Sequence, residues 1–190
     1  APFYTIQLAI FAGMLFFGAV FFEFRALEKS EVSEALPLIG TISPVATLWL
    51  AHIFLGTSLG LADIIGFVFL IGGGFVIFLA EKGKLKSDLL LSAAAASFLL
   101  AGSFIASKIA FSQTTFITAF FWIKIGGAVL AVMLLGFGGL RKKIVRSAKH
   151  STPKNKKLYF ANRAYAAVGS LLVSGAIFLA NPALVNSTQN

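Results

Sequence analysis

The chain has 190 residues, of which 58% are hydrophobic and 12% are charged, and its mean hydropathy is +0.90. Too few polar side chains are present to cover a water-soluble globule of this length, which excludes an ordinary soluble domain. The formal net charge of +9 would suit nucleic-acid binding, but half of the sixteen basic residues fall between Arg141 and Lys157, a pattern typical of cytoplasmic anchoring beside a membrane.

Six apolar stretches approach the length of about 20 residues that a helix needs to cross a hydrocarbon core of roughly 30 Å. In chain order the predicted spans are Phe3 to Phe22, Ala35 to Phe54, Ile64 to Ala80, Leu89 to Ala106, Thr115 to Gly136 and Tyr159 to Ala180. The ten-residue alternation of outer-membrane barrels does not occur. We therefore expect an all-α integral membrane protein, a multi-span helical bundle whose main partner is the lipid bilayer.

A 13-residue sequence that begins near the end of the first predicted span is partly repeated near the end of the chain. GAVFFEFRALEKS begins at Gly18 and GAIFLANPALVNS begins at Gly175, and six of the thirteen positions are identical. The two copies belong to the first and the sixth predicted spans, so the repeat is displaced by five spans. A repeat displaced by an odd number of spans crosses the membrane in the opposite direction, as in the inverted repeats of many secondary transporters. Chance alignment of two apolar helices is the alternative.

The second predicted span contains two prolines, Pro37 and Pro44. Each proline lacks a backbone donor and crowds the carbonyl one turn earlier, so we expect this span to be kinked or broken. In transporters such breaks let the two halves of a helix move.

The fifth predicted span contains a charged residue, Lys124, about ten residues from its start, where snorkelling to an interface is hardest. We expect Lys124 to contact a solute or a coupling ion. The polar residues of other spans that could lie near it are Gln7, Asn162 and Tyr165. The alternative is that the span begins later and leaves Lys124 at the interface beside Trp122.

The last ten residues, NPALVNSTQN, lie where a seventh span would begin. If they are helical, polar groups from Asn181 onwards lie at membrane depth, which is tolerated only beside a polar cavity or a partner. We therefore include Asn181 among the residues of the solute pathway. A plain exit loop is the alternative.

Residues for catalysis or metal binding do not form a recognisable set. Cysteine is absent, and the two histidines, His52 and His150, are not joined by a metal-binding spacing. No span holds two carboxylates for acid–base chemistry, and no phosphate-binding loop occurs. We expect neither an enzyme nor a bound cofactor or metal, so any transport would draw on gradients.

The distribution of lysine and arginine predicts the orientation in the membrane. The loops after the first, third and fifth spans hold thirteen basic residues, against Lys108 alone in the other two loops. Because positive loops are retained in the cytoplasm, the three basic loops are expected to be cytoplasmic, with Ala1 outside.

Several short motifs occur in FRALEKSEVSEALPLIGTISPVATLWLAHIFLGTSLGLADIIGFVFLIGGGFVIFLAE. They are Ala-Leu after a helix, a proline within the next helix, a Leu-Gly turn and two glycines seven residues apart, formed by Ala26 and Leu27, Pro44, Leu55 and Gly56, and Gly66 and Gly73. In these motifs the stretch resembles the third to fifth helices of the EamA-type drug/metabolite transporter superfamily. LVSGAIFLANPALVNSTQN is similar to the eighth helix and the entry to the ninth. Thr57 departs from the pattern, since the family often has glutamate there.

The resemblance implies a ten-helix transporter of two inverted five-helix repeats, of which about four spans lie outside this chain. Residues 1–80 would be the last three helices of the first repeat and residues 87–190 the beginning of the second, with a linker over 81–86. The resemblance also aligns Lys124 with a position where members often have arginine in the seventh helix. The usual family orientation, with the third helix running outward, is the reverse of the charge prediction.

The expected function is therefore a secondary transporter that moves a small organic metabolite or drug by alternating access, as a monomer or homodimer in a prokaryotic inner membrane. Two alternatives stay open. One is a lipid-linked sugar flippase of the same fold, and the other is a non-transporting scaffold whose basic loop binds a protein or anionic lipid. A charged residue at membrane depth distinguishes a transporter from a scaffold, because a solute pathway uses such a residue and a scaffold has no need of Lys124 there.

Overall fold

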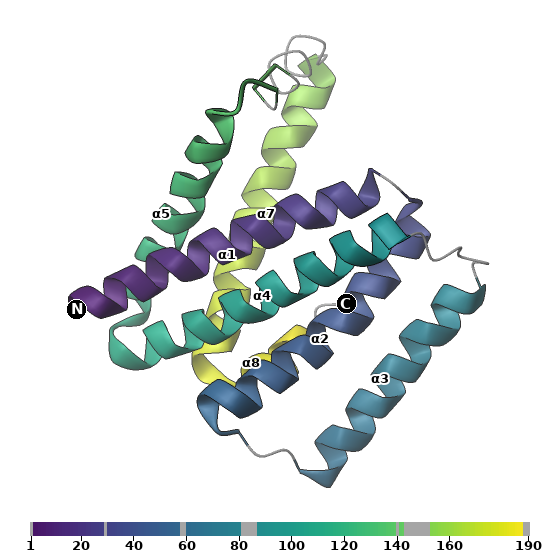
Figure 1. The fold of residues 1–190 in the computed structure, drawn as a ribbon. Coiled ribbons are helices and arrows are strands. Elements are labelled where there is room, and N and C mark those ends of the chain that lie inside the picture. Colours follow the sequence, from purple (N-terminus) through teal and green to yellow (C-terminus); the bar gives the residue numbers. More distant parts are fainter. Residues whose placement is uncertain are drawn as a thin grey trace.

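The structure is a computed structural model that describes residues 2–28, 30–57, 60–80, 87–139, 141–142 and 153–187 (Figure 1). The regular elements in these ranges are all α-helices. They are α1 (Phe3–Leu27), α2 (Val32–Leu55), α3 (Leu61–Ala80), α4 (Ser87–Gln113), α5 (Phe116–Leu135), α7 (Pro153–Leu179) and α8 (Pro182–Ser187). The predicted linker over 81–86 and most of the basic loop, 143–152, lie outside the described residues.

Five of these helices are long and apolar enough to cross a membrane: α1, α2, α4, α5 and the segment Lys157–Leu179 of α7. The prediction of a multi-span helical membrane protein is confirmed at this level. In α3, a helix of 20 residues, the described apolar segment is the shorter Ile64–Gly74, so the third predicted span, Ile64 to Ala80, stays a prediction.

Lys108 was expected in a loop after the fourth span, and this expectation is wrong. It lies inside α4, which continues to Gln113. Ser107 and Lys108 end the apolar run and so end the predicted span. They do not end the helix, because neither residue removes a backbone hydrogen bond as proline would.

Helix α4 lies at the centre of the bundle, between α1 and α2 (Figure 1). Helix α5 packs against α1 and α3 packs against α2, while α8 packs against α2 and also contacts α4 and α7. Small side chains allow these close contacts: the Ser103 hydroxyl on α4 donates to the Ala12 carbonyl on α1 at 2.9 Å. In lipid, where association rests on packing and interhelical hydrogen bonds, such approach is a main source of stability.

The closest approach is between α1 and α5. A Cβ atom at Gly13 would overlap the carbonyl oxygen of Ile123, and one at Gly126 would overlap that of Ile10. The two glycines therefore form a reciprocal contact in which each helix backbone lies against the other, which only glycine permits.

Helix α2 is continuous through both of its prolines. Of the two predicted outcomes, a kink or a break, the break does not occur, and a kink at Pro37 or Pro44 stays a prediction. Hydroxyl groups bond to carbonyls within this helix, since Thr41 donates to the Pro37 carbonyl at 2.7 Å and Thr47 to the Ser43 carbonyl at 2.8 Å. These carbonyls therefore have a second partner inside the bundle.

The end of α2 is set by Gly56, whose φ of 62° lies in the left-handed region. This conformation terminates a helix at low cost only when the residue has no Cβ atom. It explains the glycine of the Leu-Gly turn.

The chain continues from α7 into α8 after a sharp break. Asn181 caps α8, because its side-chain oxygen accepts from the Ala183 amide at 3.0 Å. At the same break the Lys108 ammonium donates to the carbonyls of Phe178 and Ala180, at 2.9 Å each. A cation there satisfies the carbonyls left unpaired at the end of α7 and opposes their partial negative charge.

Helix α8 packs against α2 and buries Asn186 completely. Over Pro182–Ser187, the alternative of a plain exit loop is therefore wrong, while residues 188–190 lie outside the described residues. The expected partner of the polar groups also exists, since the Asn186 amide donates to Ser43 at 2.8 Å and to Thr47 at 2.5 Å.

Candidate functional site

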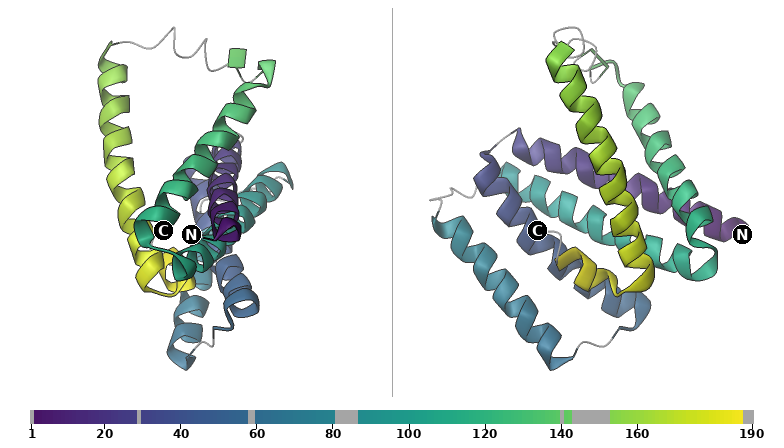
Figure 2. Two further views of the ribbon diagram at one scale, coloured as in Figure 1. Left: turned by 90° about the vertical axis from the view of Figure 1, so that its left-hand side faces the viewer. Right: turned by 180° about the vertical axis from the view of Figure 1, so that it is seen from behind.

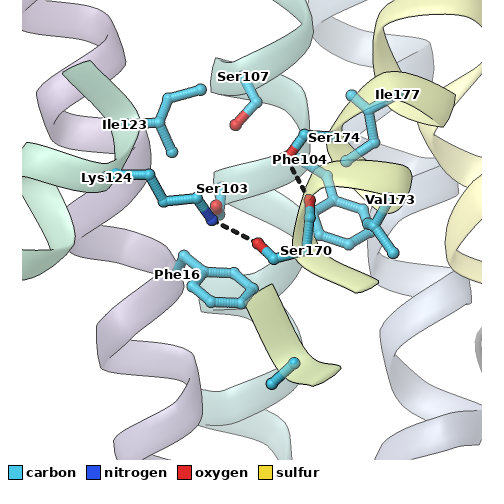
Figure 3. A pocket seen from close by; sticks show the side chains of 11 residues that line it. Phe16, Ser103, Phe104, Ser107, Ile123, Lys124, Ser170, Val173, Ser174 and Ile177 are labelled. Atoms are coloured by element: carbon cyan, nitrogen blue, oxygen red, sulfur yellow. Dashed lines mark hydrogen bonds between the residues drawn. The ribbon is translucent and has the colours of Figure 1, made fainter. Parts of the chain in front are cut away.

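Helices α1, α4, α5 and α7 enclose a cleft of about 230 Å³ (Figure 3). Helices α5 and α7 converge at one end and diverge towards the other (Figure 2, left), and the lining residues of α7 lie in its half nearer to α8. The cleft is lined by Phe16 from α1, Ser103, Phe104 and Ser107 from α4, Ile123 and Lys124 from α5, and Ala166, Ser170, Val173, Ser174 and Ile177 from α7.

Lys124 is the charged residue of this lining. Its ammonium donates a hydrogen bond to the Ser170 hydroxyl across the cleft (Figure 3). The same nitrogen lies 4.8 Å from the centre of the Phe120 ring and 5.7 Å from that of Phe16. Both distances fall within the range of cation–π attraction.

These contacts offset only part of the cost of a charge in the bilayer. Placing lysine near the centre of a membrane helix costs about 2.5 to 3.5 kcal/mol on insertion scales. Cation–π contacts return about 0.5 to 2 kcal/mol, and an interhelical hydrogen bond in a membrane about 0.6 kcal/mol. None of the residues that line the cleft is acidic, so the remaining cost is not met by a salt bridge within this lining.

Four serine side chains give the cleft its other polar groups, and two of them already donate to backbone. Ser103 donates to Ala12 of α1, and Ser174 donates to the Ser170 carbonyl one turn earlier, at 2.8 Å. The remaining wall is aromatic or aliphatic. The arrangement is a small apolar chamber with one cation and several hydroxyls, which is the usual composition of a site for a small organic molecule.

Of the five residues predicted for the solute pathway, only Lys124 lines the cleft. Gln7, Asn162 and Tyr165 lie outside the cleft lining and are exposed. Lys124 is also an exposed residue, but its ammonium is directed towards Ser170 in the cleft. Asn181 uses its side chain to cap α8. Pro37 and Pro44 lie on α2, which contributes no residue to the cleft.

Sequence reasoning missed the partner of Lys124. None of the four serines, the pair Ser103 and Ser107 and the pair Ser170 and Ser174, was among the candidate site residues predicted from the sequence. Each pair has a spacing of four residues, which places both hydroxyls on one face of a helix. This repeated spacing in two apolar helices was the available signal for a polar chamber.

The sequence matches no protein-family model, and no curated protein or solved structure is significantly similar to it.

Proposed function

We propose that the chain is part of a secondary transporter of the EamA type, which moves a small organic solute across a prokaryotic inner membrane by alternating access. The observation that carries this proposal is the position of Lys124, in a chamber with hydroxyls between four helices. A charged residue among apolar helices is a functional-site hypothesis by default, because its cost selects against it elsewhere. The chamber joins α1 of the first predicted repeat to α4, α5 and α7 of the second.

The repeated 13-residue sequence supports the inverted repeat. Its first copy, from Gly18 to Ser30, runs through the end of α1, and its second copy, from Gly175 to Ser187, runs through the end of α7 and all of α8. The two copies are displaced by five predicted spans, and a displacement by an odd number of spans reverses the direction in which the repeat crosses the membrane.

Helix α7 has a large apolar face without a partner among the described helices. In its most apolar segment only 6% of residues are buried, against 56% in α4. In the proposed ten-helix transporter, spans that lie outside this chain would cover that face.

Counterflow in proteoliposomes tests the proposal. Vesicles loaded with a mixture of small metabolites would contain either the wild-type protein, Lys124→Met or Lys157→Met, and the solutes exchanged would be identified by mass spectrometry. Lys124→Met keeps much of the side-chain length and removes the charge. We expect at least one solute to exchange in the wild type, and its rate to fall about tenfold or more in Lys124→Met, as for loss of a charged contact.

Lys157→Met is the matched control, because Lys157 is exposed at the start of the apolar part of α7. Its exchange rate should equal that of the wild type. Exchange of no solute by the folded wild-type protein would favour the scaffold alternative. An unchanged rate in Lys124→Met would reduce Lys124 to an interface anchor.

A further inference from the structure

The chamber presents two hydrogen-bond donors side by side. The Lys124 ammonium has three hydrogens, of which one is directed at Ser170. Because the Ser170 oxygen accepts that hydrogen bond, its own O–H is available to donate to a third group, such as a bound solute. An acceptor placed between the two side chains would receive hydrogen bonds from both.

The net charge of the residues that line the cleft determines whether a cationic, neutral or anionic acceptor binds there most favourably. Lys124 brings one positive charge, and no carboxylate lines the cleft to balance it. A cationic solute would be repelled, and a neutral one would leave the lysine charge uncompensated. An anion with a single charge removes the imbalance and forms the stronger, charge-assisted hydrogen bonds.

The remaining walls select the body of the solute. Phe16, Phe104, Ile123, Val173 and Ile177 give the chamber an apolar surface. An apolar cavity of about 150 Å³ accommodates a benzene molecule. The chamber of about 230 Å³ therefore has room for a ring or branched chain of that size together with a charged head group.

Resting on the proposed function, we infer that the solute is a small organic monoanion, with an apolar body against the aromatic and aliphatic wall and a carboxylate-like head group bound by Lys124 and Ser170. Carboxylates fit this description best, because one lysine and one hydroxyl match the two oxygens and the single charge. A multiply charged phosphate would require further cations, which the described lining does not supply.

Competition binding to the purified full chain tests the inference with three probes of nearly equal size. Radiolabelled benzoate would be displaced by unlabelled benzoate, by neutral benzamide and by cationic benzylamine. We expect saturable benzoate binding, with benzamide about tenfold weaker since neutral hydrogen bonds are roughly half as strong as charge-assisted ones, and benzylamine weaker still. Lys124→Arg should retain benzoate binding, and Lys124→Met should lose it.

The inference is wrong if benzoate does not bind the wild type saturably, if benzamide or benzylamine competes as well as benzoate, or if folded Lys124→Met binds benzoate like the wild type. The probe comparison needs no variant, so a folding defect in one cannot obscure it. Failure here is separable from failure of the proposed function. If the proteoliposomes exchanged only cations or neutral solutes, the proposed transport would be supported and the anion site contradicted. If benzoate bound but no solute exchanged, the anion site would be supported and the proposed transport contradicted.

Discussion

Asn186 of α8 donates a hydrogen bond of 2.5 Å to the Thr47 hydroxyl of α2, across 139 residues of chain. The same amide donates to the Ser43 hydroxyl at 2.8 Å, and all three side chains are completely buried. Hydrogen bonds between membrane helices fix which faces meet, because a polar group left unpaired in lipid is costly. This cluster therefore sets how α8 packs against α2.

A double-mutant cycle measures this link. Replacing Asn186 by leucine removes the amide at similar volume, and Thr47→Val removes its acceptor. Interhelical hydrogen bonds in membranes are worth about 0.6 kcal/mol on average and about 1.7 at most, so we expect a coupling energy in this range for unfolding in mixed micelles.

Asn162→Leu is the control for that cycle, because Asn162 is exposed on α7. Its stability should match the wild type. A coupling energy near zero between Asn186 and Thr47 would contradict the hydrogen-bonded contact of α8 with α2.

The glycine contact between α1 and α5 predicts an unequal response to one added methyl group. Gly13→Ala and Gly126→Ala should each destabilise the protein by about 1 to 3 kcal/mol, because the methyl group meets backbone that cannot rotate away. Gly169→Ala on α7 is the matched control, since its Cβ atom would meet nothing within 4 Å. Alanine is the better helix former by about 1 kcal/mol, so the control should be neutral or stabilised. Equal effects in all three variants would contradict the close approach.

Lys108 predicts a local change at the junction of α7 and α8. Lys108→Met removes two charge-assisted hydrogen bonds to the end of α7 and should cost about 1 kcal/mol. Hydrogen exchange of the amides over 176–185 should become faster, while exchange in α1 stays the same. Lys108→Arg retains the charge and should restore protection. Uniform exchange changes throughout the chain would indicate general destabilisation instead of loss of this cap.

The positive charges predict which side of the membrane each loop faces. Thirteen basic residues occur in or beside the three connections expected to be cytoplasmic, against Lys108 alone beside the other connections. Some of these basic residues are helical, since Lys108 lies inside α4, Arg25 inside α1, and Lys154, Lys156 and Lys157 inside α7. Cysteine labelling in this cysteine-free chain checks the orientation. An impermeant reagent outside intact cells should modify Ser112→Cys and leave Ser147→Cys, whose position lies outside the described residues, unmodified. The reverse pattern would support the usual family orientation.

The approximate positions of the five membrane-length helices followed from apolar length alone, because a helix is the way a single apolar segment satisfies its backbone in lipid. Their ends were less predictable. The hydropathy signal stops at the first polar residues, as at Ser107, while the hydrogen-bond ladder of α4 continues to Gln113. At Gly56 the reverse holds, since a residue type associated with positive φ marks the end of α2 directly.

For the candidate site, sequence located the charge but not its surroundings. Lys124 was identifiable because a lysine interrupts an apolar run. Its neighbours depend on how α5 and α7 are rotated and how far apart they lie, which no local pattern specifies, and so Asn162 and Tyr165 were chosen instead of Ser170. The last ten residues were predictable in part. Their polar groups implied a buried partner, but only the tertiary packing determined that Asn186 contacts Thr47.

Water access to the chamber from both sides of the membrane tests the central claim most directly. Ser174→Cys would place a thiol in the cleft, and Leu172→Cys would place one on the same helix outside it, where the native side chain is 66% exposed and expected to face lipid. A thiol ionises and reacts only where water reaches it. With an impermeant thiosulfonate applied to right-side-out and inside-out vesicles, we predict modification of Ser174→Cys from each side and of Leu172→Cys from neither. Modification of Ser174→Cys from one side only, or from neither, would contradict alternating access through this cleft.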